Sequence, residues 1–141
     1  MAINTRFSVG IHILAYIEIN AGVATSSENI AKSVNTNAAV IRKIMGMLKK
    51  ADLIQVRPGI AGASLARSIS EITLFDIYRA VNASNDSELF NMHKNTDPDC
   101  TIGSNLETTL EPIFITAQNA LEKALQNVTI ADIIDVIYTK Q

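Results

Sequence analysis

The residues that could do chemistry in this sequence are mostly cations, and they are gathered in one part of it. From Lys32 to Arg67 there are seven basic residues and a single acid, Asp52. Arg and Lys side chains bind phosphate groups, and Arg can also donate two parallel hydrogen bonds to a guanine edge. The formal net charge of −2 conceals this segment. A local basic surface can bind a polyanion whatever the total charge, and ordinary charge scatter on a solvated surface is the alternative.

The two halves of the chain differ in sign. Residues 1–81 hold nine basic and five acidic residues, whereas residues 82–141 hold three basic and nine acidic ones. The acidic half contains four side chains of types that ligate transition metals, namely His93, Asp97, Asp99 and Cys100. They show no repeated ligand spacing, so we expect a polar loop with one thiol, and neither a metal site nor a cofactor.

Cys100 is the only cysteine, which excludes an intramolecular disulfide. A single thiol in a polar loop could instead act as a redox sensor, and this alternative stays open. Four nearby acids are expected to raise the pKa of the thiol and so to protect it from oxidation.

Motifs typical of catalysis are missing from the sequence. There is no nucleophile elbow, no phosphate-binding glycine loop and no paired-histidine motif, so the sequence predicts that the protein is not an enzyme. The uncharged run over residues 7–17 contains His12 and is far shorter than the roughly 18 apolar residues of a membrane span. We therefore expect a cytoplasmic protein with no membrane partner.

The cations lie in a succession of short predicted elements. Thr5 is a potential N-cap for a helix over about residues 6–19, and Ser26 and Ser27 begin a helix of barely two turns. After a turn at residues 35–37, apolar residues at steps of three and four predict a helix over about 38–50. Four cations lie outside its apolar stripe: Arg42, Lys43, Lys49 and Lys50. A short helix, a tight turn and a longer basic helix are the order of a helix-turn-helix.

A hairpin is predicted directly after these helices. Residues 53–57 alternate like a strand, residues 58–63 contain Pro and Gly, and residues 64–67 can form the returning strand. A hairpin behind a helix-turn-helix, with a basic residue on each arm, is typical of the wing of a winged helix. Ser70 or Thr73 can cap the helix that follows.

The C-terminal third predicts a dimerisation arm. Residues 82–104 have almost no periodicity, and from Asn105 to Val128 apolar residues recur along one helix face. Pro112 predicts a kink or a later helix start, and Thr129 can cap a closing helix. A second copy of the chain could cover the long stripe, or the stripe could pack on its own domain. The stripe residues expected in the dimer are Leu110, Phe114, Ala117, Leu121 and Leu125.

The sequence resembles the Rrf2 family of bacterial winged helix-turn-helix transcription regulators over nearly its whole length. The segments that carry the resemblance are residues 5–7, 26–31, 40–54, the wing from Arg57 to Arg67, residues 72–81, and residues 117–121 and 128–133. It implies a mainly helical fold with a small hairpin wing. The implied divisions are a DNA-binding domain over 1–83, a linker over 84–104, and dimerisation and closing helices over 105–141.

Two departures from the family pattern bear on function. Many members hold an iron–sulfur cluster with three cysteines, whereas this chain has only Cys100, so we expect no cluster. The wing usually carries a glycine pair and an aromatic residue, and residues 61–63 read Ala-Gly-Ala instead.

The resulting hypothesis is a sequence-specific regulator, a repressor, that binds double-stranded operator DNA with an inverted repeat as a homodimer. A winged helix used for protein contact, or a thiol redox sensor without a cluster, is the alternative. The effector stays unknown. The expected DNA-binding residues are Thr5, Arg6, Ser26, Ser27, Asn37, Val40, Arg42, Lys43, Lys49, Arg57, Ser64 and Arg67.

Overall fold

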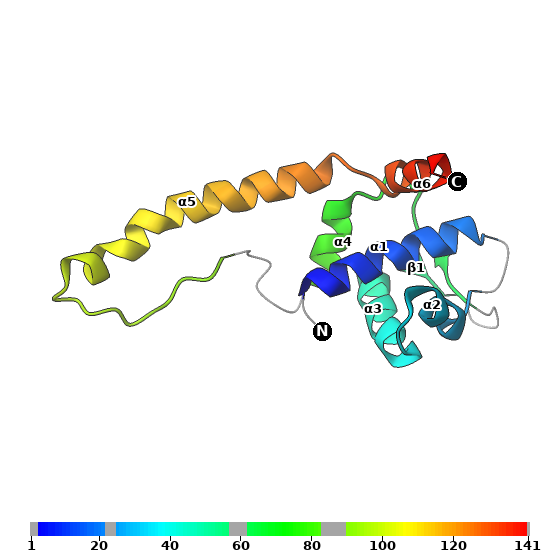
Figure 1. The fold of residues 1–141 in the computed structure, drawn as a ribbon, viewed down its shortest axis with the longest axis horizontal. Coiled ribbons are helices and arrows are strands. Elements are labelled where there is room, and N and C mark those ends of the chain that lie inside the picture. The colour runs from blue at the N-terminus through cyan, green and yellow to red at the C-terminus, as the bar shows by residue number, and fades with distance from the viewer. Residues whose placement is uncertain (1–2, 22–24, 57–61, 83–89, 141) are drawn as a thin grey trace.

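The computed structural model describes residues 3–21, 25–56, 62–82 and 90–140. Helices dominate this part of the chain, and it contains one two-stranded sheet (Figure 1). In chain order the elements are α1 (Ile3–Ile19), α2 (Ser27–Val34), α3 (Ala38–Lys50), β1 (Ile54–Gln55), β2 (Ser64–Leu65), α4 (Leu74–Val81), α5 (Thr101–Gln126) and α6 (Ile130–Thr139).

The second and third helices form the predicted helix-turn-helix. The Ser26 hydroxyl accepts a hydrogen bond from the Asn29 N–H at 3.1 Å and begins α2. Asn35 ends α2 in the left-handed conformation with φ 65°, which asparagine tolerates better than most residues. The Asn37 side chain then accepts from the Val40 N–H at 2.9 Å and begins α3. The bounds of α3 agree with those predicted from its periodicity.

The hairpin pairs β1 with β2 in antiparallel register, Ile54 opposite Leu65. At its far end Gly62 has φ +84°, and a Cβ there would lie 2.6 Å from the Thr25 backbone nitrogen. The Thr25 hydroxyl donates to the Ala63 carbonyl at 3.2 Å. The hairpin is thus fastened to the segment that precedes α2, and the fold is a winged helix-turn-helix, as predicted. Arg57 and Ala61 lie outside the described residues.

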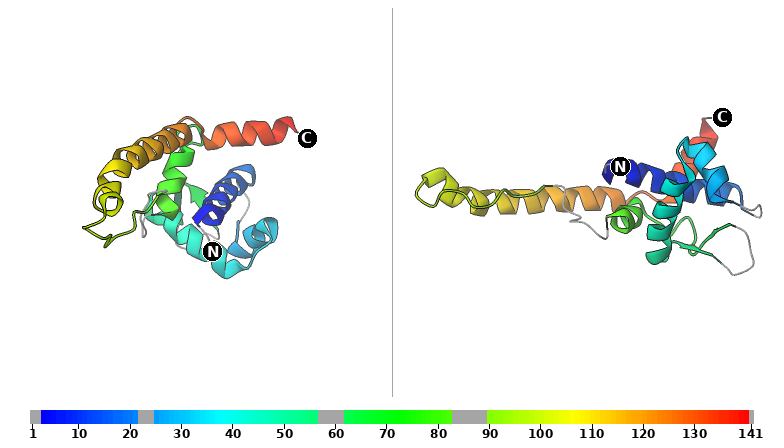
Figure 2. Two further views of the ribbon diagram at one scale, coloured as in Figure 1. Left: turned by 60° about the vertical axis from the view of Figure 1, so that its left-hand side comes forward. Right: turned by 90° about the horizontal axis from the view of Figure 1, so that it is seen from below.

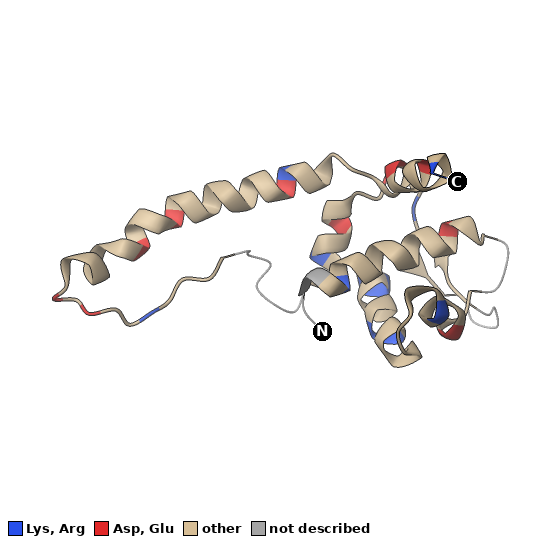
Figure 3. Ribbon diagram, viewed as in Figure 1, with Lys and Arg blue, Asp and Glu red and all other residues tan. Residues whose placement is uncertain are grey.

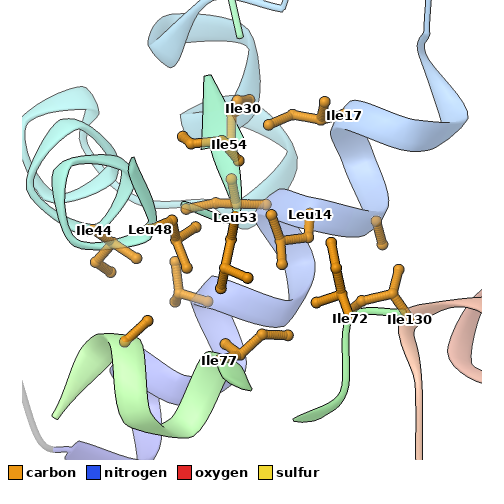
Figure 4. Close-up of a cluster of buried hydrophobic side chains, with 14 of the residues drawn as sticks. Leu14, Ile17, Ile30, Ile44, Leu48, Leu53, Ile54, Ile72, Ile77 and Ile130 are labelled. Carbon is orange, nitrogen blue, oxygen red and sulfur yellow. The ribbon is translucent and has the colours of Figure 1, made fainter. Parts of the chain in front are cut away.

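One aliphatic core joins all these elements except α5. Ile13 and Leu14 of α1 lie at its centre and are fully buried. Figure 4 shows side chains from the other elements gathered around Leu14, including Ile44 and Leu48 of α3. The first helix is therefore buried along most of its length, which explains its nearly uniform apolar sequence.

A short backbone bridge attaches the closing helix α6 to the start of α4. The periodicity of apolar residues in the sequence did not predict this bridge. Thr73 and Thr129 face each other in an isolated antiparallel bridge. The Leu74 N–H donates to the Val128 carbonyl at 2.9 Å, and the Ile130 N–H donates to the Ile72 carbonyl at 3.0 Å. Both threonines also cap the helices that follow them, as predicted, each in a capping box with an aspartate. We call α1–α4, the hairpin and α6 the body.

The fifth helix projects far from the body, and the extended residues 90–100 lie beside it (Figures 1 and 2). The chain runs outward through these residues and returns to the body through α5. We call residues 90–126 the arm. The Phe90 ring stacks on the Phe114 ring of α5 with centroids 4.9 Å apart. None of the 26 residues of α5 is buried, although it contacts α4. Among the described helices, none is long and apolar enough to cross a bilayer.

Two predicted helix starts are wrong. The long helix begins at Thr101 instead of 105. The Ser104 N–H donates to the Cys100 carbonyl at 2.9 Å and the Asn105 side-chain amide donates to the Thr101 carbonyl at 2.7 Å, so residues 101–104 form its first turn. Pro112 lies inside this helix, so the predicted late start after the proline is wrong, and the kink stays a prediction. The first helix begins at Ile3, which places Thr5 inside it and not at its N-cap.

Candidate nucleic-acid interface

The third helix presents two opposite faces. Ile41, Ile44 and Leu48 turn inward and are buried. The outward face carries four exposed cations, Arg42, Lys43, Lys49 and Lys50. Figure 3 shows basic residues along α3 and acidic residues along α5. The charge segregation read in the sequence therefore becomes a basic helix surface on the body and an acidic arm.

A groove of about 370 Å³ lies beside this basic face. Its walls are the start of α2, the outward side of α3 and the hairpin, and we call it the α3 groove. It brings together four predicted site residues from two helices: Ser26, Ser27, Arg42 and Lys49. Glu28, Gly46, Val56 and Gly62 also line it. A groove that combines cations, hydroxyls and a helix N-terminus is suited to an anionic chain.

Arg42 is the cation with the most defined position. Its Nη1 donates to the Ser27 hydroxyl at 3.4 Å and lies 3.5 Å from the Glu28 carboxylate. The Arg42 and Glu28 side chains are 58% and 69% exposed, so solvent screens this pair and it contributes little to stability. The pair orients the guanidinium across the groove, where an incoming phosphate or base edge would compete with Glu28.

Several predicted contact residues have a structural task in the fold. The oxygens of Ser26 and Asn37 are occupied by the helix caps described above. Val40 is half-buried against the core. Arg67 pairs with Asp76 of α4 at 3.2 Å, which directs its guanidinium toward the body.

The remaining predicted residues are dispersed. Ser64 and Arg67 line a different groove, next to the end of α1. Thr5 is exposed and Arg6 is half-buried in the first turns of α1. Arg57 lies outside the described residues. The structure therefore brings together predicted residues of α2 and α3, whereas Ser64 and Arg67 of the hairpin lie apart from them.

Lys50, Glu28 and Gly46 are among the residues of this surface that were absent from the predicted set. Lys50 belongs to the exposed face of α3, and its spacing of seven residues from Lys43 is a signal that could have included it. Glu28 and Gly46 carry no positive charge, so a search for phosphate-binding side chains overlooks them. Both line the α3 groove.

On the arm, the extended segment is fastened to α5 by an ion pair. The Lys94 ammonium donates to the Glu107 carboxylate at 2.7 Å, and this hydrogen bond and charge raise the pKa of Lys94. The predicted dimer residues Leu110, Phe114, Ala117, Leu121 and Leu125 are all half-exposed. The stripe they form is therefore incompletely covered by its own chain.

Cys100 lies exposed at the N-cap of α5. The backbone N–H groups of Gly103 and Ile102 point at the sulfur and lower the pKa of the thiol. The predicted rise in its pKa is therefore wrong. The thiol faces the N–H groups of a helix N-terminus, and no nearby acid is among the causes of the shift.

The donor set does not fit an iron–sulfur cluster, which takes four ligands, mostly cysteine thiolates. The chain has one cysteine, so even two copies would supply two. Within the described ranges, no three His, Cys, Asp or Glu side chains are grouped to hold a metal ion.

Both the sequence and the fold of this chain have relatives among known proteins. The model of the Rrf2 family, described as iron-dependent transcriptional regulators, matches residues 3–136. YwnA of Bacillus subtilis, provisionally named an HTH-type transcriptional regulator, is 40% identical over 136 residues, which cover 96% of this chain and 99% of YwnA. A crystal structure provisionally described as that of a DNA-binding protein is 38% identical, with a TM-score of 0.74, and the match covers 92% of this chain and 98% of that one.

More distant solved structures share the fold. CymR of B. subtilis, described as the global cysteine regulator, is 20% identical with a TM-score of 0.69, over 96% of this chain and 97% of CymR. IscR of T. potens is 19% identical with a TM-score of 0.71, over 100% of this chain and 91% of IscR.

Proposed function

Since the chain belongs to the Rrf2 family, whose members are DNA-binding transcriptional regulators and not enzymes, we propose that it is a repressor that binds an inverted-repeat operator as a homodimer. The observation that carries this proposal is the row of exposed cations on α3, whose opposite face is fixed in the core. A rigid helix with one basic face can enter the major groove without rearrangement of the fold.

In this proposal α3 lies in the major groove, with Arg42 and Lys43 nearest the base edges and Lys49 on a phosphate. Ser27 and the N–H groups at the start of α2 bind the neighbouring strand. Thr5, Arg6, Ser64 and Arg67 are peripheral phosphate contacts. Because the target is the bacterial chromosome, the protein acts in the cytoplasm.

The homodimer is supported by the arm. A helix of 26 residues with an apolar stripe and no buried residue needs a further partner surface. A second copy supplies the same stripe across a two-fold axis, which also presents two α3 helices to the DNA. Two recognition helices related in this way read half-sites one helical turn or a multiple apart.

Selection of genomic fragments with the purified protein tests the proposal directly. The enriched fragments should share an inverted repeat, and the footprint on them should be symmetric.

Arg42→Ala should weaken binding and relax preference at one base pair, a change of about 1–3 kcal/mol. Lys49→Ala should weaken all sequences alike and lower the salt slope by about one. If neither variant changes affinity at low salt, α3 does not face DNA and the protein-contact alternative takes its place.

A second candidate function concerns the signal. The exposed Cys100 thiol with a lowered pKa favours a redox sensor, because the thiolate is the form that peroxide oxidises. Peroxide should then change operator affinity in the native protein and leave Cys100→Ser unaffected. Equal responses of the two proteins would make Cys100 a passive residue of the arm.

A further inference from the structure

Gly46 lies at the centre of the exposed face of α3. Arg42 and Lys43 precede it by one helical turn, and Lys49 and Lys50 follow it by one turn. Residues three and four apart are neighbours on a helix surface, so the four cations frame the glycine. The basic surface of α3 therefore has a position without a side chain at its centre.

Nothing in the described part of the fold requires a glycine at this position. A Cβ added to Gly46 would meet no heavy atom within 4 Å outside the local helix backbone. Its φ is not positive either, whereas Gly62 combines φ +84° with a close approach to Thr25. Glycine in a helix interior is less stable than alanine, because it loses more backbone freedom on folding. Gly46 thus weakens α3 without serving its packing.

The open spot lies on the wall of the α3 groove. Gly46 lines it on the α3 side, and Val56 and Gly62 line it on the hairpin side. In duplex DNA a single sugar–phosphate strand separates the major groove from the minor groove. A protein with a helix in one groove and a hairpin in the other must therefore leave room for that strand between them.

We propose that Gly46 provides the clearance where one sugar–phosphate strand of bound DNA crosses α3, between the cations Arg42 and Lys49. The inference rests on the proposed function, because it needs α3 to face DNA. The charge of the groove suits a phosphate strand: Glu28, its one acidic side chain, is paired with Arg42 in the free protein. A methyl group at position 46 keeps the strand away from the helix and lengthens the phosphate contact of Lys49.

Gly46→Ala tests the inference, because folding and binding should change in opposite directions. The variant should have a higher Tm, by about 3 °C, since alanine stabilises the helix. Its Kd should rise by about tenfold on the selected operator and on a mixed-sequence duplex of equal length, since a backbone clash is independent of sequence. A loss of binding in a more stable protein cannot arise from unfolding.

Ala51→Ser is the matched control. Ala51 is exposed just after α3, and it lines a different groove, with Met47 and Arg79. This change also adds one heavy atom, and it should leave both Kd values unchanged.

Three results would overturn the inference. Unchanged affinity of Gly46→Ala would show that nothing approaches this spot. A loss confined to the operator would place base edges, and not the backbone, at Gly46. A fall in Tm would show that the glycine serves the fold after all. In each case native protein that binds the operator leaves the proposed function standing, whereas native protein that binds no DNA removes both.

Discussion

We expect the exposed ion pair between Arg42 and Glu28 to limit the strength of DNA binding. The carboxylate lies 3.5 Å from the guanidinium and lines the same groove, so it would compete with a phosphate or a guanine for Arg42. Glu28→Gln keeps the side-chain size and removes the charge. We expect the variant to bind operator DNA about tenfold more tightly at low salt, with a smaller gain at high salt.

The comparison of Glu28→Gln with Glu71→Gln separates this effect from a change in net charge. Glu71 is exposed, and it does not line the α3 groove. Titration of labelled operator at two salt concentrations measures both variants. Equal gains would show that Glu28 acts only through the total charge.

The Cys100 thiol gives a prediction on pH. Its pKa is lowered in the folded chain by the N–H groups of Gly103 and Ile102, so between the folded and unfolded pKa values the native protein holds more thiolate. The native chain should therefore react with iodoacetamide faster than the urea-unfolded chain at neutral pH. The midpoint of its pH–rate profile should lie lower, and a higher native midpoint would contradict the lowered pKa of the folded thiol.

The helix caps are the elements whose contribution is easiest to isolate. In the capping box of α6 the Thr129 hydroxyl accepts from the Asp132 N–H at 3.2 Å, while the Asp132 carboxylate accepts from the Thr129 N–H at 2.9 Å. Thr129→Ala should lower the free energy of unfolding by about 1 kcal/mol, and the Tm by about 3 °C. Thermal unfolding at fixed protein concentration measures this change.

Thr139→Ala is the control at the opposite end of the same helix. The Thr139 hydroxyl only donates to the Asp135 carbonyl at 2.7 Å and is exposed, so its loss should leave the Tm within about 1 °C. If both changes destabilise the protein equally, the cap does not fix α6.

The elements differ in how far their sequence determines them. The bounds of α3 follow from its local signals, since Asn37 caps it and its apolar residues repeat at helical spacing. The start of α5 does not follow from local signals, because Thr101 and Ser104 read as loop residues, yet the Thr101 carbonyl accepts hydrogen bonds from the Ser104 hydroxyl and the Asn105 side-chain amide. Of the candidate site, the row of cations on α3 was predictable. The Glu28 pair, the α3 groove and the Thr73–Thr129 bridge depend on tertiary packing, which periodicity does not contain.

At the scale of the whole molecule, the arm predicts the oligomeric state. Leu121 lies on the half-exposed stripe of α5. Leu121→Glu would bury an unpaired carboxylate in a two-fold interface and should yield monomers or aggregates. Asn119→Glu places the same charge at an exposed position nearly opposite on the helix and should leave the dimer intact. Light scattering at micromolar concentration measures the oligomeric state of the native protein and both variants. A monomeric native protein would contradict the assignment of the arm as a dimer interface.

The bridge between Thr73 and Thr129 has a consequence for how the length of this chain can change. The chain leaves the bridge into α4 and the arm and returns to it at Val128, so both ends of this long excursion are hydrogen-bonded at one place in the body. Segments whose ends lie close together are those at which proteins accept insertions and deletions. A short linker that runs from the end of α4 back along this helix to Val128 could therefore replace the arm and leave a compact DNA-binding unit, and a different arm could be grafted between the end of α4 and Val128.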